Sequence, residues 1–198
     1  MATSVFRAHG VPARTRVGFA RYLVAGSLED HFVTEYWNGT RWTLLDAQLD
    51  PETRRVLGIG FAPSDVPREQ FVDASTVWRG IRGGEIDPSR VGITVVGLTG
   101  AWFAAQSVLR DVTALDRDEV LPWDTWSRGR EVSPAARDVA DSFATALDAV
   151  TARLAGIPDA EAVAAVHREQ PWIRQERSIF TLAFPNGWPE GVPSEVVR

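Results

Sequence analysis

The stretch HFVTEYWNGTRWTLLD, residues 31–46, decides the fold that we expect for this chain. Two runs rich in aromatic and β-branched residues flank the dipeptide Asn38-Gly39. Asn-Gly is the strongest short-range signal for a two-residue hairpin loop, because both residues tolerate positive φ. The stretch therefore predicts a tight antiparallel hairpin with a titratable side chain at each outer end, His31 and Asp46.

The expected register brings these two side chains together. If Asn38-Gly39 is the whole loop, counting outward along both strands pairs His31 directly with Asp46. Directly opposed residues have Cβ atoms about 4.5–5.5 Å apart, so the carboxylate can accept the Nδ1 proton of the imidazole and leave Nε2 free for chemistry. A longer loop or a bulge would break this register. The competing interpretation is an ordinary polar pair at the end of a surface hairpin, which contributes up to about 1 kcal/mol.

The rest of the chain predicts short strands followed by helices. Helices are predicted where apolar residues recur at helical spacing and Ser, Pro or Gly stands at the ends of the run. Strands are expected over residues 15–23 and in both arms of the hairpin, and helices over residues 67–82, 100–115, 133–154 and 158–167. The predicted fold class is α+β, with a small antiparallel sheet in residues 1–60 and a helical lobe in residues 61–198 packed on it.

The composition narrows the classes of function. With 44% hydrophobic and 24% charged residues, the chain has the composition of a globular protein. It contains no Cys, and its three His residues lack the spacing of a metal motif, so we expect neither a disulfide framework nor a metal or other cofactor. The net charge of −5 argues against a nucleic-acid partner.

The sequence also carries no membrane signal. No apolar run approaches the length that spans a bilayer, and the N-terminus lacks the charged, apolar and small-residue pattern of a signal peptide. We therefore expect a cytoplasmic protein that has no membrane partner.

Three strings in the first fifty residues resemble the transglutaminase-like superfamily, which has a papain-like fold and a Cys-His-Asp triad. They are GVPAR at residues 10–14, DHFVTEYW at residues 30–37 and RWTLLDAQ at residues 41–48. In that superfamily a Gly-Ile/Val-Pro-Ala-Arg turn follows the nucleophile helix, a His begins the next strand, and a Trp-x-x-x-Asp strand supplies the triad acid. Farther on, residues 60–71, 78–88 and 100–126 are similar to one bacterial branch of that group.

The resemblance implies roles for particular residues. It makes His31 the general base and Asp46 the acid that orients it, with Gly10, Pro12 and Arg14 in the turn that follows the nucleophile helix. It also implies an acyl-transfer enzyme that hydrolyses or forms an amide, with a peptide or a small amide as its substrate.

The nucleophile of this family is missing, because the chain contains no Cys. Residues 1–10 have the composition of the last two turns of a helix, with Gly10 as the stop signal and no N-cap ahead of it. We therefore expect the chain to begin inside a longer helix, and the 198 residues alone to be inactive. Ser4 is no substitute, because it lies too near the end of that helix for the helix dipole to stabilise an anionic nucleophile.

Two hypotheses are open from the sequence. The first is a transglutaminase-like enzyme that lacks the segment with its nucleophile, and the second is a cysteine-free pseudoenzyme that binds a ligand or a partner protein in the old cleft. A shortened helix would also expose apolar surface, which would favour a homo-oligomer.

Overall fold

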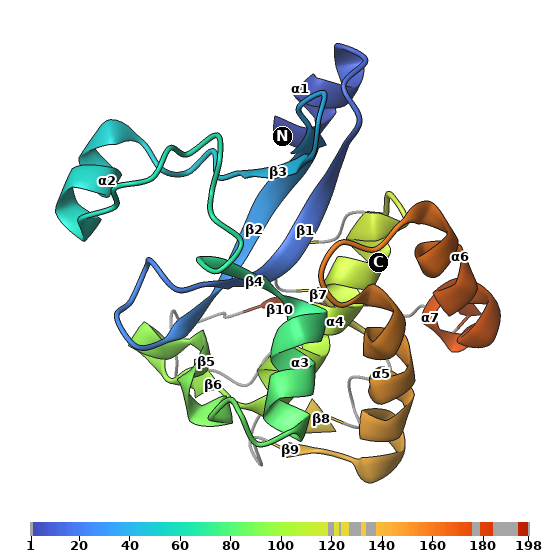
Figure 1. Ribbon diagram of the computed structural model, residues 1–198. Helices are drawn as coiled ribbons and strands as arrows, with labels where there is room; N and C mark the ends of the chain where they lie inside the picture. The colour runs from blue at the N-terminus through green and yellow to red at the C-terminus, as the bar shows by residue number, and fades with distance from the viewer. Residues whose placement is uncertain are drawn as a thin grey trace.

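The computed structural model describes residues 2–118, 121–122, 124–126, 132–133, 138–175, 179–183 and 194–197. The architecture is mixed α/β: a six-stranded sheet is covered by helices (Figure 1), and a three-stranded sheet and a two-stranded sheet lie outside it. This arrangement fits the predicted α+β class.

The centre of the main sheet is formed by three antiparallel strands, as predicted. Strand β1 (Ala13–Ala20) pairs along its whole length with β2 (Leu28–Trp37), and β3 (Trp42–Leu45) pairs with the end of β2. The observed β1 ends three residues earlier than the predicted strand, at Ala20 rather than Leu23. Residues 21–27 then form the loop that leads into β2.

Short strands from later in the chain extend the sheet on both sides. Strand β4 (Phe71–Asp73) pairs with β1, β5 (Val91–Ile93) runs parallel to the start of β2, and β6 (Leu98–Thr99) pairs with β5. The sheet therefore takes strands from both sides of residue 60, where the sequence suggests a domain boundary, and that division stays a prediction.

The helices differ from the predicted ones mainly at their N-termini. Their bounds are α1 Ala2–Ala8, α2 Pro51–Leu57, α3 Ala74–Arg82, α4 Ala101–Leu115, α5 Asp141–Leu154, α6 Ala160–Glu169 and α7 Trp172–Gln175, with 3₁₀ turns η1 at Pro88–Arg90 and η2 at Thr94–Val96. The small sheets contain β7 (Asp124–Trp126), β8 (Val132–Ser133), β9 (Asp138–Val139), β10 (Ile179–Ala183) and β11 (Ser194–Val197). The predicted helices over residues 100–115 and 158–167 are confirmed as α4 and α6.

Two predicted helix starts are wrong. The helix expected from Pro67 begins only at Ala74, because Asp73 is its N-cap and accepts a hydrogen bond from the amide of Thr76, while Phe71 belongs to β4. The helix expected from Ser133 begins at Asp141, since Ser133 lies in β8. Of the segment between them, residues 134–137 lie outside the described residues.

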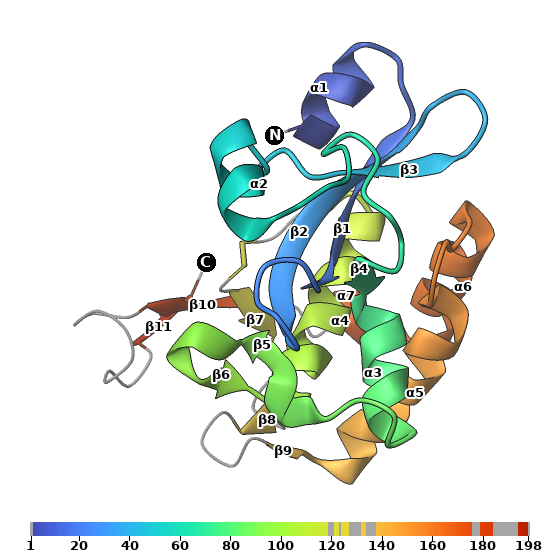
Figure 2. The ribbon, with the colours of Figure 1, turned by 60° about the vertical axis from the view of Figure 1, so that its left-hand side comes forward.

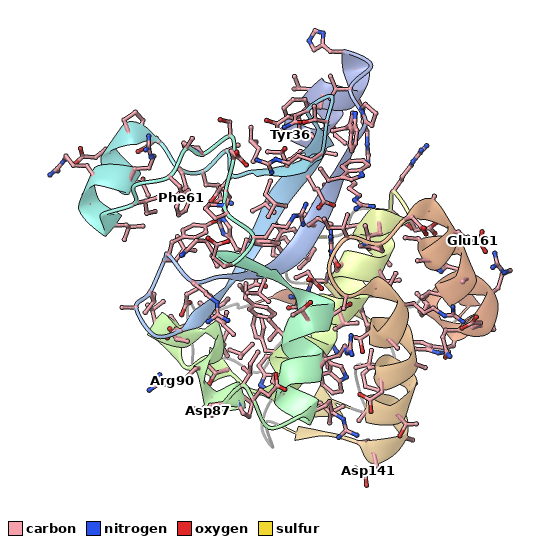
Figure 3. The ribbon with its side chains drawn as sticks, viewed as in Figure 1. Tyr36, Phe61, Asp87, Arg90, Asp141 and Glu161 are labelled. Atoms are coloured by element: carbon pink, nitrogen blue, oxygen red, sulfur yellow. The ribbon has the colours of Figure 1, made fainter. Side chains whose placement is uncertain are left out.

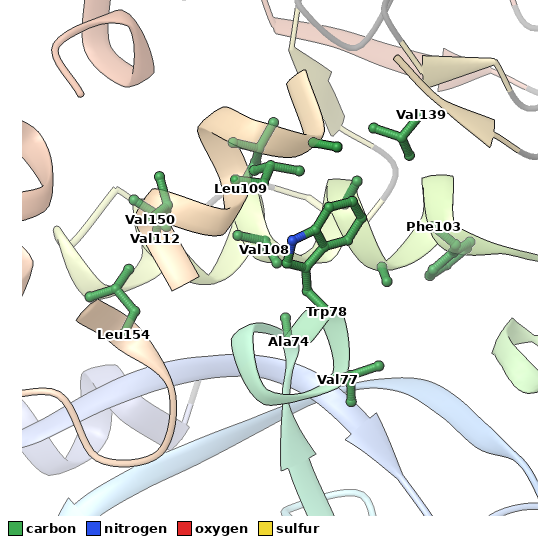
Figure 4. Packing of buried hydrophobic residues seen from close by; sticks show 14 of the residues in the cluster. Ala74, Val77, Trp78, Phe103, Val108, Leu109, Val112, Val139, Val150 and Leu154 are labelled. Atoms are coloured by element: carbon green, nitrogen blue, oxygen red, sulfur yellow. The ribbon is translucent and has the colours of Figure 1, made fainter. Parts of the chain in front are cut away.

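The main hydrophobic core lies between the sheet and helices α3, α4 and α5. Trp78 of α3 lies at its centre, against Val108 and Leu109 of α4 (Figure 4). The indole N–H of Trp78 donates to Asp148 of α5 at 2.8 Å, so the polar atom of this buried ring has a partner. Phe19 of β1 connects the sheet to the same core.

A buried ion pair attaches α4 to the edge of β1. Arg16 is 1% exposed, and its guanidinium donates to both carboxylate oxygens of Asp111, at 3.1 and 3.0 Å. The backbone N–H of Val17 also donates to Asp111, at 2.8 Å. Because β4 pairs only with residues 18–20, the Asp111 carboxylate occupies the edge of β1 that β4 leaves open.

Helix α2 stands apart from helices α3, α5 and α6, as Figures 1 and 2 show. None of its residues is buried, and Val56 is 66% exposed. Asp50 and Gly58 cap its two ends, with Gly58 in the left-handed conformation. The loop that follows α2 returns to the sheet, where Val66 bonds to β3.

Candidate active site

The hairpin between β2 and β3 has a longer loop than the sequence predicts. Trp37 pairs with Trp42, not with Thr40, so the loop contains residues 38–41. In the predicted register His31 would lie directly opposite Asp46, and that register is wrong by two residues.

The side chain of Asn38 accounts for the longer loop. Its Oδ1 accepts hydrogen bonds from the backbone N–H groups of Thr40 and Arg41, both at 3.0 Å. The backbone N–H of Asn38 donates to the carbonyl of Arg41 at 3.1 Å. The chain therefore forms an Asx-type turn instead of the two-residue loop, because the Asn38 side chain accepts hydrogen bonds from two backbone N–H groups of the loop.

The contact between His31 and Asp46 exists in spite of this shift. A slip of two residues keeps every side chain on its own face of the sheet, whereas a slip of one would reverse the faces. Asp46, just past the end of β3, lies diagonally from His31, and its Oδ2 is 2.7 Å from the imidazole Nε2. The two side chains are 7% and 0% exposed, so the contact is shielded from water.

The imidazole nitrogen in this contact is not the predicted one. The sequence predicts Nδ1 on the carboxylate, whereas in the structure Asp46 lies diagonally from His31 and Nε2 makes the contact. When His31 is neutral and Asp46 is ionised, Nε2 carries the proton and Nδ1 has the free lone pair. The contact with Asp46 therefore occupies Nε2 and leaves Nδ1 as the nitrogen available as a base.

The Asp46 carboxylate is held in its ionised form by its donors. Oδ1 accepts from the backbone N–H of Gln48 at 2.9 Å, and Oδ2 accepts from His31 and from the Tyr22 hydroxyl at 2.8 Å. Burial alone raises the pKa of Asp46, but the contacts with His31, Gln48 and Tyr22 outweigh it and hold the pKa below its usual value. The charge on Asp46 is therefore available to stabilise an imidazolium.

Sequence reasoning missed Tyr22, the third member of this group. It lies in the loop between β1 and β2, and burial together with the Asp46 carboxylate raises the pKa of its hydroxyl. Its ring meets the His31 ring edge-on, with centroids 6.0 Å apart. No strand periodicity reaches a loop residue, so the sequence contains no signal that could have identified it.

A pocket of about 410 Å³ lies beside His31. Along one edge of β2, β5 pairs with Leu28 and Glu29, and β3 pairs with residues 34–37. Residues 30–33 have no strand partner on that edge within the described chain, and the pocket lies there. Most of its wall is apolar, formed by Leu23, Val24, Phe32, Ile93, Val95 and Pro122.

Two carboxylates, the buried Glu29 and the partly buried Asp30, also line this pocket. Both oxygens of Glu29 accept from the amide of Thr94, and one also accepts from the Thr94 hydroxyl, which ties η2 to the pocket wall. Asp30 lies 3.8 Å from Arg110 of α4. Burial raises the pKa of Asp30, and Arg110 and His31 counteract this only in part.

A second pocket, of about 430 Å³, adjoins the first and shares Phe32 and Gln48 with it. Ala2 and Thr3, in the first turn of α1, form part of its wall. The hydroxyl of Thr3 bonds to those of Thr15 and Thr34, at 3.0 and 2.9 Å, which fixes α1 on the sheet. The start of α1 is therefore directed at the space next to the His31 pocket.

Gly10 and Arg14 of the GVPAR string have structural roles, one at the end of α1 and the other in bonds between elements. Gly10 ends α1 with a φ of 76°, as the sequence predicts for a stop signal. Arg14 donates to Glu35 at 2.6 Å and to the carbonyl of Pro158 at 2.6 Å, and its guanidinium lies over the ring of Trp42. Ser4 is exposed and lines neither pocket.

A larger pocket, of about 900 Å³, lies elsewhere, between the start of β1 and α6. It is lined by Arg7, Arg14, Arg117 and Arg168 among others, and contains neither His31 nor Asp46. Size alone therefore does not identify the site, and the buried acid–base pair is the more specific marker.

Neither a metal site nor a membrane-spanning helix is found in the part of the chain that the structure describes. It contains no group of three or more His, Asp or Glu residues that could hold a metal ion. No helix in it has the length and apolar character required to cross a bilayer.

No family model matches the chain, and neither the curated proteins nor the solved structures gave a match to it.

Proposed function

We propose that His31 and Asp46 are the general base and the orienting acid of a transglutaminase-like acyl-transfer site whose thiol nucleophile comes from outside these 198 residues. The observation that carries the proposal is the buried 2.7 Å contact between Nε2 and Asp46, which leaves Nδ1 as the basic nitrogen beside a pocket. The resemblance of residues 10–48 to that superfamily supports the same assignment.

The chemistry follows from the protonation states. With the Nε2 proton held by Asp46, the Nδ1 lone pair accepts the proton of a thiol, and the resulting thiolate attacks the carbonyl carbon of an amide. The imidazolium then protonates the departing amine, and an acyl-thioester remains. Water or a second amine, deprotonated by the same imidazole, attacks the thioester carbonyl and releases the thiol.

The two adjoining pockets support a location for the nucleophile. A thiol must lie within hydrogen-bond reach of Nδ1, and the His31 pocket provides space beside that ring. The neighbouring pocket begins at the first turn of α1, and a helix that continued α1 toward its N-terminus would enter it. A nucleophile carried by such a helix would approach His31 from this side.

A binding module is the second candidate, and the absence of Cys favours it. A pocket of about 410 Å³ with a mostly apolar wall and a few polar groups has the size and character of a small-ligand site. In this reading the same pocket takes an acyl or peptide ligand, or a segment of a partner protein, without turnover.

The gene provides the first test. Reading the DNA upstream of the Met1 codon separates the candidates, because an in-frame helix that carries Cys supports the enzyme and a stop codon directly upstream supports the binding module.

Kinetics of the extended protein provide the second test. We expect it to hydrolyse a fluorogenic amide, and His31→Ala to lower the rate about 10²–10⁴-fold, the usual contribution of general acid–base catalysis. The 198 residues alone should show no turnover, since loss of a triad nucleophile costs roughly 10⁶-fold. His9→Ala replaces an exposed histidine and should leave the rate unchanged. Equal rates in His31→Ala and the parent would remove His31 from the mechanism.

A further inference from the structure

Tyr22 is the only residue besides His31 whose side chain bonds to the Asp46 carboxylate within the described chain. Its hydroxyl donates to Oδ2 at 2.8 Å, and the same oxygen is 2.7 Å from Nε2 of His31. The other oxygen, Oδ1, accepts from the backbone N–H of Gln48. The carboxylate therefore has an anchor on each oxygen that does not depend on the histidine.

We propose that Tyr22 is a positioning residue for the His31–Asp46 pair: its hydroxyl sets the plane of the Asp46 carboxylate, and its ring holds the edge of the imidazole. The importance of this role for catalysis rests on the proposed function, whereas the contacts themselves do not.

The Tyr22 hydroxyl orients the Asp46 carboxylate independently of the imidazole. A carboxylate with one donor can rotate about its last bond and offer either oxygen, but donors on both oxygens fix its plane. Tyr22 and Gln48 supply those two donors from different segments, the loop after β1 and the residues after β3. His31 then meets an acceptor that is already oriented, which favours the tautomer with the proton on Nε2.

The ring makes a separate contribution. It lies edge-on to His31 with an interplanar angle of 88°, and edge-on to Phe61 with ring centroids 5.3 Å apart. Phe61, labelled in Figure 3, reaches the site from the loop that follows α2. Tyr22→Phe keeps this packing and removes only the hydroxyl, so the two contributions can be measured apart.

The closing experiment uses the 198-residue chain and needs no turnover. The titration of the Asp46 carboxyl carbon is followed by ¹³C NMR, with Asp46→Asn to assign the signal. A hydrogen bond to a charged group contributes about 1.5–3 kcal/mol, so Tyr22→Phe should raise the Asp46 midpoint by roughly one to two pH units. His31 and Tyr22 are the titratable groups in contact with Asp46, so His31 is titrated in the same samples.

The second tyrosine of the chain is the matched control. Tyr36 lies beside α1 (Figure 3), where its ring stacks on Phe6, and its hydroxyl donates to the carbonyl of Ser64 and not to Asp46. Tyr36→Phe removes an equivalent hydroxyl and should leave the Asp46 midpoint unchanged. An unchanged midpoint in Tyr22→Phe, or an equal shift in both variants, would overturn the proposal.

A measurement on the unmodified chain covers the case in which Tyr22→Phe fails to fold. The ring Cζ signal of Tyr22 is followed as the pH is raised, and Tyr22 should ionise above the ordinary tyrosine value of about 10, since its proton is held by a carboxylate. Ionisation of Tyr22 at or below about pH 10 would contradict the contact. Inactivity of the extended protein would refute the proposed function and leave both of these NMR results intact.

Discussion

At the scale of single residues, the described site depends on one buried carboxylate. Asp46 is 0% exposed, yet its pKa lies below the usual value because His31, Gln48 and Tyr22 all donate to it. A group whose folded pKa is lowered stabilises the fold at any pH above its unfolded pKa, which is about 3.9 for Asp. That stabilisation is lost as the pH falls below about 4.

The first prediction concerns acid unfolding. Asp46→Asn should lower the free energy of unfolding at pH 7 by roughly 1.5–3 kcal/mol, because the amide cannot accept all three donors. The difference from the parent should shrink as the pH falls through the window below about 4, where the parent loses the same contribution. Urea titrations between pH 7 and pH 2.5 measure this. Asp65→Asn removes an exposed carboxylate paired with Arg41 and should change little.

The contact between His31 and Asp46 could be predicted from the sequence, but its atoms could not. The two side chains stay on the same face of the sheet when the register shifts by two residues, so the contact could form in either register. The choice of nitrogen depends on the loop length, and that was decided by the hydrogen bonds of the Asn38 side chain. Tyr22 reaches Asp46 from a loop, where no periodic pattern applies.

At the scale of elements, strand β1 requires a glycine at position 18, where it passes between β2 and β4. Gly18 of β1 pairs with His31 on one side and with Asp73 of β4 on the other. A Cβ atom at this position would lie 2.4 Å from the carbonyl oxygen of Val72 and 2.9 Å from Cα of Asp73. These neighbours are backbone atoms and cannot move without moving β4.

The second prediction follows from that close approach. Gly18→Ala should lower the free energy of unfolding by about 1–3 kcal/mol, the usual cost of overpacking, because β1 and β4 must separate. The matched control is Gly60→Ala, where the added Cβ would meet no atom within 4 Å. Chemical denaturation of both variants measures the difference. Equal stability of the two would show that β4 adapts freely.

The hydrophobic pattern of the sequence predicted the long helices and strands better than the short ones. The fifteen-residue helix α4 and the strands β1 and β2 have enough residues to show their period. Strand β4 has three residues, and the helical spacing of Phe71, Ala74, Trp78 and Ile81 continues through it, so the predicted helix began too early. Pairing with β1, a contact between distant parts of the chain, decided the conformation of Phe71.

At the scale of the whole molecule, one core joins the sheet to the later helices. The buried cluster runs from Phe19 in β1 through α3 and α4 to Leu147 in α5 and Ile173 in α7. The sequence places sheet and helices in separate segments, and it does not show that they share a core, because the residues that meet are far apart along the chain.

The third prediction tests this shared core. Leu147→Ala in α5 should lower the free energy of unfolding by about 2–5 kcal/mol, since the side chain is fully buried. Tryptophan fluorescence and far-UV circular dichroism should still report one coincident transition, because the sheet and α5 unfold together. Val56→Ala on the exposed face of α2 should change the stability by less than about 0.5 kcal/mol. Two separated transitions would instead support independent domains.

The contacts of the Arg16 guanidinium bear on the order in which the chain folds during its synthesis. It bonds to Asp111 and, at 2.9 Å, to the carbonyl of Gly156, which is 140 residues away along the chain. While the ribosome has produced only the first hundred residues, this cation would have only its longer pairings with Glu35 and Asp73, at 3.5 and 3.9 Å, and not the two-pronged contact with Asp111, so burial of that edge would be less favourable. The environment of Arg16 is therefore completed only once α4 and Gly156 have been made, late in synthesis.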